Sequence, residues 1–372
     1  MKVQLDRVEQ ALSRMWDERA AKGAAAHVCL ANVVALCVDA DRVTGVTETL
    51  NTLMPSLPGR AIVVAMEDSG EAGITADVDL VLNAKKEACG ELLSVTVRGA
   101  ARDWLANAIE VLLAPGGRAY VWWVGDIPDD ATMFDQLTAI ADVVMVNSEE
   151  MDLRDLRTLS RLVAAEAGRY SLADLNWVRL RSWQELLARF FDDPAVLPQL
   201  KTARTLTVSS APHRIDAHDE PTSTQAALYA GWFAASIGCE MAAATWEPKS
   251  GRTRTVSVPR DGGGALAIRF EVTERADVFP GAITGIALET DDGSKFEVAR
   301  QEDRHVLGWS GNCAGAVIPQ AVLRVGIAQD ARMLARQLDS PVRDPLFEAS
   351  LAATTTLIRP LYPVDSRPPV KA

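Results

Sequence analysis

The segment from Tyr170 to Phe191 combines tryptophan, arginine and helix-start signals more densely than any other part of the chain. Guanidinium groups bind carboxylates through paired hydrogen bonds, and tryptophan is enriched at the energetic centres of protein interfaces. These residue types therefore favour recognition of a partner molecule. The candidate partner-binding residues in this segment are Asp174, Trp177, Arg179, Arg181 and Trp183.

The same segment has the pattern of an amphipathic helix. Ser171 is followed three residues later by Asp174, which matches a capping box and predicts that a helix begins there. Leucine and aromatic side chains then form one apolar stripe on the helical wheel. Ser182 and Glu185 repeat the capping spacing, which favours a break into two short helices near Arg181.

Two polar side chains, Asn176 and Arg179, project from this apolar stripe. An unpaired buried polar group costs about 1–3 kcal/mol, so each needs a partner within this chain or across an interface. For Trp177 and Trp183, packing in the core and a place in an interface both remain open. The neighbouring arginines favour a place in an interface.

A second tryptophan pair, Trp122 and Trp123, falls on a predicted strand at 119–124. Adjacent side chains on a strand point to opposite faces of the sheet. One indole therefore belongs to the core, whereas the other either lies under a helix or is exposed at a binding surface. Both are candidate partner-binding residues.

A glycine-rich loop that binds phosphate would indicate a cofactor site or a catalytic site. The sequence contains neither Gly-x-Gly-x-x-Gly after a strand nor Gly-x-x-x-x-Gly-Lys-Ser/Thr. The run from Pro115 to Arg118 contains two glycines and is interpreted as a turn between a helix and a strand. No cofactor is predicted.

Two other groups contain residue types that can bind a metal or act as a nucleophile. A polar cluster precedes a predicted helix, where capping of backbone N–H groups is preferred to metal binding. A glycine-rich run could present a serine or a cysteine, but the strand–Gly-x-Ser-x-Gly–helix elbow is absent. Neither group is predicted to be catalytic or to bind a metal. The residues concerned are His213, Asp216, His218, Asp219 and Glu220 in the first group, and His305, Ser310 and Cys313 in the second.

Composition excludes several classes of protein. The charge is 38 − 50 = −12, which repels nucleic acid and anionic lipid. The amino terminus opens a charged amphipathic helix instead of a signal peptide, and no apolar run of membrane-spanning length occurs. We therefore expect a cytoplasmic protein that binds neither nucleic acid nor membranes.

The five cysteines are scattered, without a Cys-x-x-Cys pair. Cys29 and Cys37 are the nearest two and fall on one predicted strand. Eight residues along a strand span roughly 26 Å, far beyond the roughly 7 Å Cα limit for a disulfide. Buried thiols and no redox switch are expected.

Alternating helices and strands fill the first part of the chain, which predicts an α/β fold with a largely parallel sheet. The continuous apolar run 28–38 is typical of a central strand covered on both faces. The expected helices are 5–21, 45–54, 101–113, 130–140 and 151–166, and the expected strands are 28–38, 61–66, 76–82, 91–97, 119–124 and 142–146.

The pattern changes after Pro194, where a strand and one long helix precede a series of short strands joined by hairpin turns. This part is predicted to be α+β, with an antiparallel meander and two closing helices. The resulting domains are an N-terminal α/β domain at 1–168, a helical connecting motif at 169–200 and a C-terminal α+β domain at 201–372. The expected helices are 221–237, 327–338 and 343–356, and the expected strands are 206–208, 241–247, 253–258, 266–272, 283–289, 294–300 and 304–309.

The run Asp174-Leu-x-Trp177-x-Arg179-Leu-x-x-Trp183-x-Glu185 resembles the central motif of the OpcA family, the glucose-6-phosphate dehydrogenase assembly proteins. Further blocks resemble that family in the same order, and the resemblance extends over nearly the whole chain. These blocks are Cys89–Glu91, Val95–Gly99, Tyr120–Pro128 and Val143–Ser148.

The resemblance implies a non-catalytic protein that binds glucose-6-phosphate dehydrogenase in the pentose phosphate pathway. It would promote assembly of that enzyme, activate it allosterically, or do both. The alternative is an enzyme or sensor with a nucleotide or sugar phosphate between two α/β domains, which the fold class alone would allow. The missing phosphate motifs favour the first interpretation.

Overall fold

The computed structural model describes residues 1–21, 29–67, 70–127, 132–165, 169–213, 222–325, 330–340 and 343–361. The chain forms two compact units, each built from several segments. The first unit contains Met1–Glu150, Val163–Leu175 and Gln329–Arg343, and the second contains Met151–Leu162, Asn176–Ala328 and Asp344–Ala372. Among the described residues, no helix has both the length and the apolar character needed to cross a membrane.

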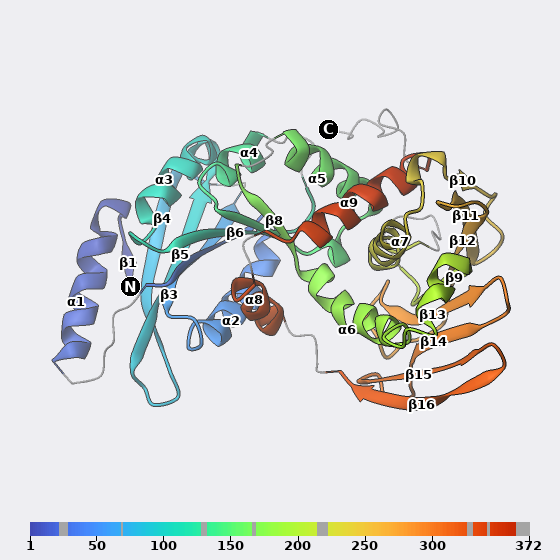
Figure 1. The fold of residues 1–372 in the computed structure, drawn as a ribbon. Helices are drawn as coiled ribbons and strands as arrows, with labels where there is room; N and C mark the ends of the chain where they lie inside the picture. The colour runs from blue at the N-terminus through green and yellow to red at the C-terminus, as the bar shows by residue number, and fades with distance from the viewer. Residues whose placement is uncertain are drawn as a thin grey trace. The chain divides into compact units, whose positions relative to one another are not determined.

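An eight-stranded sheet with the order β1-β4-β5-β3-β2-β6-β7-β8 forms the centre of the first unit (Figure 1). The six strands β5, β3, β2, β6, β7 and β8 are parallel to one another, and β4 is antiparallel to both of its neighbours, β5 and β1. The predicted α/β fold with a largely parallel sheet is confirmed. The strands are β1 (Lys2–Val3), β2 (Ala31–Cys37), β3 (Gly59–Glu67), β4 (Gly73–Leu82), β5 (Ala88–Arg98), β6 (Arg118–Val124), β7 (Val143–Val146) and β8 (Ser171–Asp174).

Apolar runs form the central strands because helices and neighbouring strands exclude water from them. All seven residues of β2 are buried, as the continuous apolar pattern predicts. Helix α1 lies against β4 and β5, and α8 packs against α2. The helices of this unit are α1 (Val8–Ala20), α2 (Val43–Leu53), α3 (Leu105–Leu112), α4 (Thr132–Thr138) and α8 (Asp330–Leu338).

The second unit contains another eight-stranded sheet, with the order β10-β11-β12-β9-β13-β14-β15-β16. Its strands are antiparallel except where β9 pairs in parallel with β12, so β9 divides the predicted meander in two. The strands are β9 (Ala203–Ser210), β10 (Thr245–Trp246), β11 (Thr253–Pro259), β12 (Ala265–Val272), β13 (Ile283–Thr290), β14 (Lys295–Arg300), β15 (Val306–Cys313) and β16 (Ala316–Arg324).

The strands of this second sheet curve around α7 (Thr224–Ser236), which packs against α9 (Pro345–Ile358) (Figure 1). The two helices approach closely: a Cβ added at Gly231 would meet Thr354 Oγ1 at 2.1 Å. Ser223 caps α7 by accepting a hydrogen bond from Ala226 N. The remaining helices associated with this unit are α5 (Leu153–Ala165) and α6 (Leu175–Arg189).

Short 3-10 helices connect several elements. They are η1 (Leu5–Arg7), η2 (Ala40–Arg42), η3 (Gly99–Trp104), η4 (Ser148–Glu150), η5 (Leu197–Thr202) and η6 (Met241–Ala243). The strand predicted at 241–247 is wrong in its first half, where η6 precedes the two-residue β10. Strand β16 was not predicted because none of its residues is buried and Pro319 interrupts its pattern. Proline is typical of an edge strand, and β16 is the last strand in the order.

Two predictions about the motif segment are wrong. Ser171 does not begin a helix, because Ser171–Asp174 forms β8 and pairs with β7. The break near Arg181 is also absent, because α6 continues to Arg189. Burial of the apolar stripe on both sides of Arg181 stabilises one continuous helix more than the local capping signal stabilises a break.

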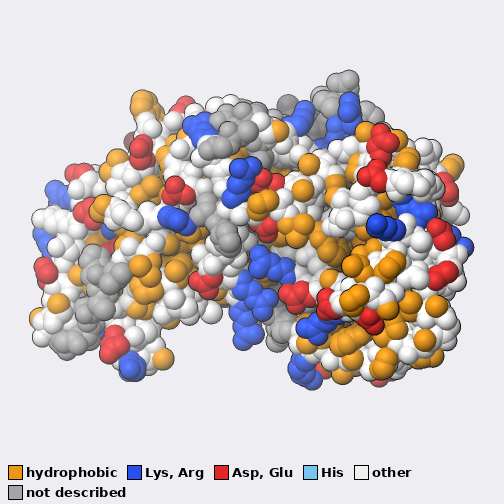
Figure 2. Space-filling view, viewed as in Figure 1, with side chains coloured by type: hydrophobic (Ala, Val, Ile, Leu, Met, Phe, Trp, Pro, Cys, Tyr) orange, Lys and Arg blue, Asp and Glu red, His pale blue; other side chains and the backbone are white. Residues whose placement is uncertain are grey.

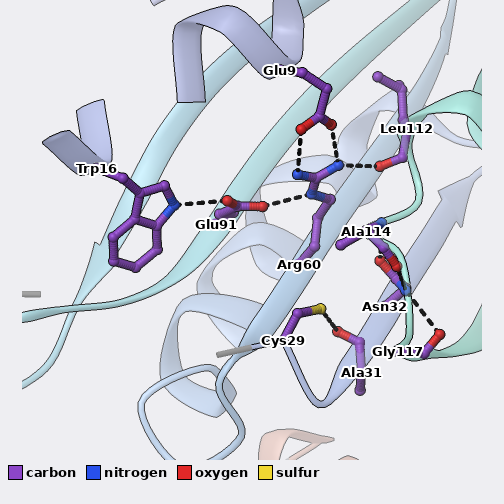
Figure 3. A network of polar contacts seen from close by, with 10 residues as sticks. All are labelled: Glu9, Trp16, Cys29, Ala31, Asn32, Arg60, Glu91, Leu112, Ala114 and Gly117. Carbon is purple, nitrogen blue, oxygen red and sulfur yellow. Dashed lines mark hydrogen bonds and ion pairs between the residues drawn. The ribbon is translucent and has the colours of Figure 1, made fainter. Parts of the chain in front are cut away.

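A buried polar network ties α1 to the amino-terminal end of the parallel sheet (Figure 3). The guanidinium group of Arg60 is 2.6 Å from Glu91, 2.5 Å from Glu9 and 2.6 Å from the carbonyl oxygen of Leu112. Trp16 donates a hydrogen bond of 2.7 Å to the other Glu91 oxygen. Burial by itself lowers the pKa of Arg60, but Glu9 and Glu91 outweigh this effect and raise it.

Candidate interaction site around helix α6

Asp174 ends β8 and is buried at the carboxyl end of the parallel sheet. One of its carboxylate oxygens accepts a hydrogen bond from Ser148 N at 3.0 Å, and the other accepts one from Ser148 Oγ at 2.5 Å. Because Ser148 directly follows the loop residue after β7, the carboxylate joins the ends of two neighbouring strands. Asp174 therefore fixes the point at which α6 starts.

Asp344 is the centre of the contacts that hold the first turns of α6. Its Oδ2 accepts a hydrogen bond from Trp177 Nε1 at 3.1 Å and lies 4.0 Å from Arg181 Nη2. Its Oδ1 caps α9 by accepting the backbone N–H groups of Leu346 and Phe347. Trp177 and Arg181 are four residues apart and share one face of the helix, so both reach this carboxylate.

The two polar residues of the apolar stripe have different environments. Asn176 is fully buried, and its Oδ1 accepts a hydrogen bond of 2.8 Å from Gln225 Nε2. Gln225 Oε1 in turn accepts the backbone N–H of Ile283 at 2.7 Å. Arg179 is only half-buried, and its guanidinium carbon lies 5.8 Å from the centre of the Phe279 ring. Asn176 thus has the internal partner that its position required.

The indoles of α6 are packed inside the second unit. Trp177 lies against Phe347 with ring centres 5.5 Å apart. Trp183 is covered by Arg300, whose guanidinium carbon is 5.4 Å from the indole ring. Both tryptophans are buried. They support the helix from its inner side, while Arg179 and Arg181 are half-buried.

Trp122 and Trp123 belong to the first unit, on β6 between β2 and β7. Both are buried. Trp123 donates a hydrogen bond of 3.0 Å to the carbonyl oxygen of Asp126 and packs on Phe134 at 5.1 Å. Opposite faces of the sheet bury the two indoles, so neither is exposed.

An accessible group remains at the start of α6, which we call the α6 surface: Arg179, Arg181, Phe279 and Leu346. Arg179 and Arg181 are half-buried, whereas Phe279 and Leu346 are exposed. Arg179 contacts Phe279, whereas Arg181 approaches Asp344, whose other oxygen accepts the backbone N–H of Leu346. Arg179 and Arg181 are two residues apart on α6 and therefore point to different sides of the helix. Two guanidinium groups beside exposed apolar side chains form the mixture typical of an interface.

The parallel sheet has the strand order β5-β3-β2-β6-β7-β8 of a doubly wound dinucleotide-binding fold, with β2 as the first strand. In that fold a glycine-rich turn after the first strand holds the pyrophosphate at a helix N-terminus. Here the turn after β2 contains Asp39 and Asp41 and no glycine before Val43. Two carboxylates at this point repel a pyrophosphate.

The carboxyl end of β3 also differs from that of a dinucleotide site. In the dinucleotide-binding fold, an acidic residue binds the ribose hydroxyls. Glu67 ends β3, but its carboxylate accepts a hydrogen bond of 2.6 Å from Arg98. The edge therefore presents repulsive or paired carboxylates in place of a phosphate cradle.

The remaining candidates from the sequence do not assemble a catalytic group. Ser310 and Cys313 lie along β15, in a strand instead of a nucleophile elbow. Burial lowers the pKa of His213, although the charge of Asp152 opposes this. Within the described ranges, no three His, Cys, Asp or Glu side chains gather as a possible metal site. Asp216, His218, Asp219 and Glu220, and also Pro221, lie outside the described residues.

Sequence reasoning missed Asp344, Phe279 and Ser148 as members of this arrangement. Asp344 precedes Pro345, a local signal for the start of a helix that the sequence does contain. Its contact with Trp177 joins positions 167 residues apart, and no periodicity reports such a contact.

Two family models match this chain. One is described as the glucose-6-phosphate dehydrogenase subunit N-terminal domain and matches residues 51–162. The other is described as the C-terminal domain of the glucose-6-phosphate dehydrogenase subunit and matches residues 170–351. The second match includes α6 and the whole α6 surface.

Two cyanobacterial relatives carry the name "Putative OxPP cycle protein OpcA". The protein from Nostoc punctiforme is 25% identical over 331 residues, which are 81% of this chain and 65% of the relative. The protein from Synechococcus elongatus is 25% identical over 328 residues, which are 83% of this chain and 70% of the relative. The chain thus spans about two thirds of the length of these relatives.

The structure is similar to that of an oxidoreductase domain protein from Kribbella flavida. The TM-score is 0.50 at 10% identity, and the match covers 89% of this chain and 96% of that chain. This likeness concerns the fold alone. With both domain models matched in order and relatives aligned over most of its length, the chain belongs to the OpcA family.

Proposed function

We propose that this chain is a non-catalytic partner of glucose-6-phosphate dehydrogenase, which it binds and whose assembly or activity it promotes. The match of both domain models, at 51–162 and 170–351, carries the proposal. The chain keeps the strand order of a dinucleotide-binding sheet but has Asp39 and Asp41 in the turn that would hold a pyrophosphate. This geometry supports a binding role more than hydride transfer.

The α6 surface is the contact that we assign to the partner. Arg179 and Arg181 offer guanidinium groups to carboxylates, and Phe279 and Leu346 offer exposed apolar area. The other candidate residues act from inside the protein in this proposal. Asp174, Trp177 and Trp183 hold α6 in place, and Trp122 and Trp123 stabilise the sheet of the first unit.

The proposal predicts a complex between this chain and the dehydrogenase of the same organism. The two purified proteins, mixed at micromolar concentration, are expected to elute together in size-exclusion chromatography. The chain is also expected to change the Michaelis constant or maximal rate of the dehydrogenase. Separate elution together with unchanged kinetics would refute the proposal.

Arg179→Ala tests the assigned surface, with Arg189→Ala as the matched control. Both are α6 arginines, but Arg189 is exposed at the opposite end of the helix. Loss of an interface anchor costs about 2 kcal/mol or more, so Arg179→Ala should weaken binding about thirtyfold. The control should bind like wild type. Equal binding by all three proteins would exclude Arg179 from the interface while leaving the partnership intact.

A further inference from the structure

Three arginines gather where α5 and α9 lie side by side in the second unit (Figure 1). The hydroxyl oxygens of Ser160 and Thr355 are 3.4 Å apart, which fixes the contact between the two helices. Arg157 and Arg161 occupy one face of α5, one turn apart, and Arg359 follows one turn after Thr355. We call Arg157, Arg161 and Arg359 the arginine cluster.

The side chains of the arginine cluster have no acidic partner among the described residues. Arg157 is half-buried, while Arg161 and Arg359 are exposed. The pKa of Arg157 is lowered by burial and by the positive charges of Arg161 and Arg359. A partly desolvated guanidinium group whose charged neighbours are cations is unfavourable until an anion joins it.

The cluster contrasts with the charge of the whole chain. Acidic residues outnumber basic ones by 50 to 38, yet three arginines concentrate positive potential where α5 and α9 meet. Such a concentration attracts anions, and an anion with more than one charge interacts with several guanidinium groups at once.

We propose that the arginine cluster binds a phosphate group, carried by inorganic phosphate or by a phosphate monoester. Guanidinium groups bind phosphate oxygens through paired, charge-assisted hydrogen bonds. The contact of the Ser160 and Thr355 hydroxyls, together with the hydrogen bond that Thr355 Oγ1 donates to the carbonyl oxygen of Ala352 at 3.1 Å, fixes the spacing of the two helices that carry the arginines. A bound phosphate offsets the repulsion between the three guanidinium groups and links α5 to the end of α9. This site is separate from the α6 surface and does not require the partnership with the dehydrogenase.

Isothermal titration calorimetry on the full chain tests the site, with inorganic phosphate and a hexose 6-phosphate as probes at constant ionic strength. We expect saturable binding of at least one probe by the wild type. Arg157→Gln/Arg161→Gln, and separately Arg359→Gln from the other helix, should weaken binding at least about tenfold. Equal affinities for the two probes would mean that the phosphate group alone is recognised, and tighter binding of the sugar phosphate would add contacts to the sugar.

Arg332→Gln/Arg336→Gln is the matched control. These two arginines have the same spacing on α8 and are exposed, and Figure 2 shows Lys and Arg side chains gathered where Figure 1 draws α8. The control should bind the probes like wild type. Absence of saturable binding by the wild type overturns the proposal, and so does an equal loss in the control.

Thermal melts without phosphate show whether each variant is folded, which the comparison of phosphate affinities requires. Because glutamine removes the repulsion, the Arg157→Gln/Arg161→Gln protein should melt no lower than wild type. If that variant melts lower, Arg359→Gln decides the question, since its side chain is exposed at the helix end. Unchanged affinity in a folded Arg359→Gln protein would then remove Arg359 from the site and overturn the three-arginine arrangement.

Discussion

Two polar networks, one in each unit, combine arginine, carboxylate and tryptophan in different ways. In the first unit Arg60 is the centre, and its side chain is only 3% exposed. It binds Glu9 and Glu91, and Trp16 satisfies the remaining Glu91 oxygen (Figure 3). Each charge faces an opposite charge or a hydrogen-bond partner inside the protein, so this arginine has little capacity left for another molecule.

In the second unit a carboxylate is the centre and the arginine lies at the edge. Asp344 is bound by Trp177 and by two backbone N–H groups, whereas Arg181 approaches it only to 4.0 Å. The Arg181 side chain is 38% exposed. The difference separates an arginine committed to the fold from one that is positioned by the fold but still available to a partner.

Arg60→Ala should have the largest effect, because it removes the centre of the buried network. Glu91 would remain buried without its cation, which typically costs about 3–5 kcal/mol of unfolding free energy. Urea denaturation measures this loss. Arg42→Ala is the control: Arg42 pairs with Glu150 at 2.6 Å near the surface, and such pairs contribute at most about 1 kcal/mol. Similar losses in both variants would contradict the distinction between the two networks.

Asp344 variants should have an intermediate effect that depends on which of its roles is removed. Asp344→Ala removes the helix cap and the acceptor of the Trp177 N–H, and should cost about 2–3 kcal/mol. Asp344→Asn keeps one oxygen, which can cap α9, but its NH2 group then faces the Trp177 N–H, so the variant should cost about 1–2 kcal/mol, less than alanine. Thermal and urea unfolding compare the two. If asparagine were as damaging as alanine, the contact with Trp177 would matter more than the helix cap.

Much of the fold follows from local patterns in the sequence. The apolar run of β2 is visible in the sequence because a strand buried on both faces is apolar at nearly every position. The helical spacing of α1 is visible because a helix buried on one face is apolar at every third or fourth position. The order of strands in each sheet does not leave such a trace. Strand β9 enters between β12 and β13, a pairing that depends on contacts some 60 residues or more away along the chain, such as Val208 with Phe270.

The candidate site shows the same limit at the level of single residues. The helical spacing of the apolar residues correctly identified α6 as a helix with polar residues on its apolar stripe. The Ser171–Asp174 pair was misread, because its spacing fits a capping box and also fits a short strand that ends on a carboxylate. The hydrogen bonds that the Asp174 carboxylate accepts from Ser148, just after β7, distinguish the strand from a helix cap.

Arg181→Ala should have the smallest effect on stability, and it tests the comparison most directly. A half-exposed arginine 4.0 Å from its carboxylate contributes about 0.5 kcal/mol or less, because water screens the attraction and the side chain loses freedom in the pair. The difference from wild type in urea denaturation should disappear in about 1 M salt, where the screening length falls to roughly 3 Å. A loss above about 1.5 kcal/mol that persists in salt would place Arg181 with Arg60, as an arginine committed to the fold. A small, salt-sensitive loss accompanied by weaker binding of the dehydrogenase would instead mean that the fold positions Arg181 for a partner.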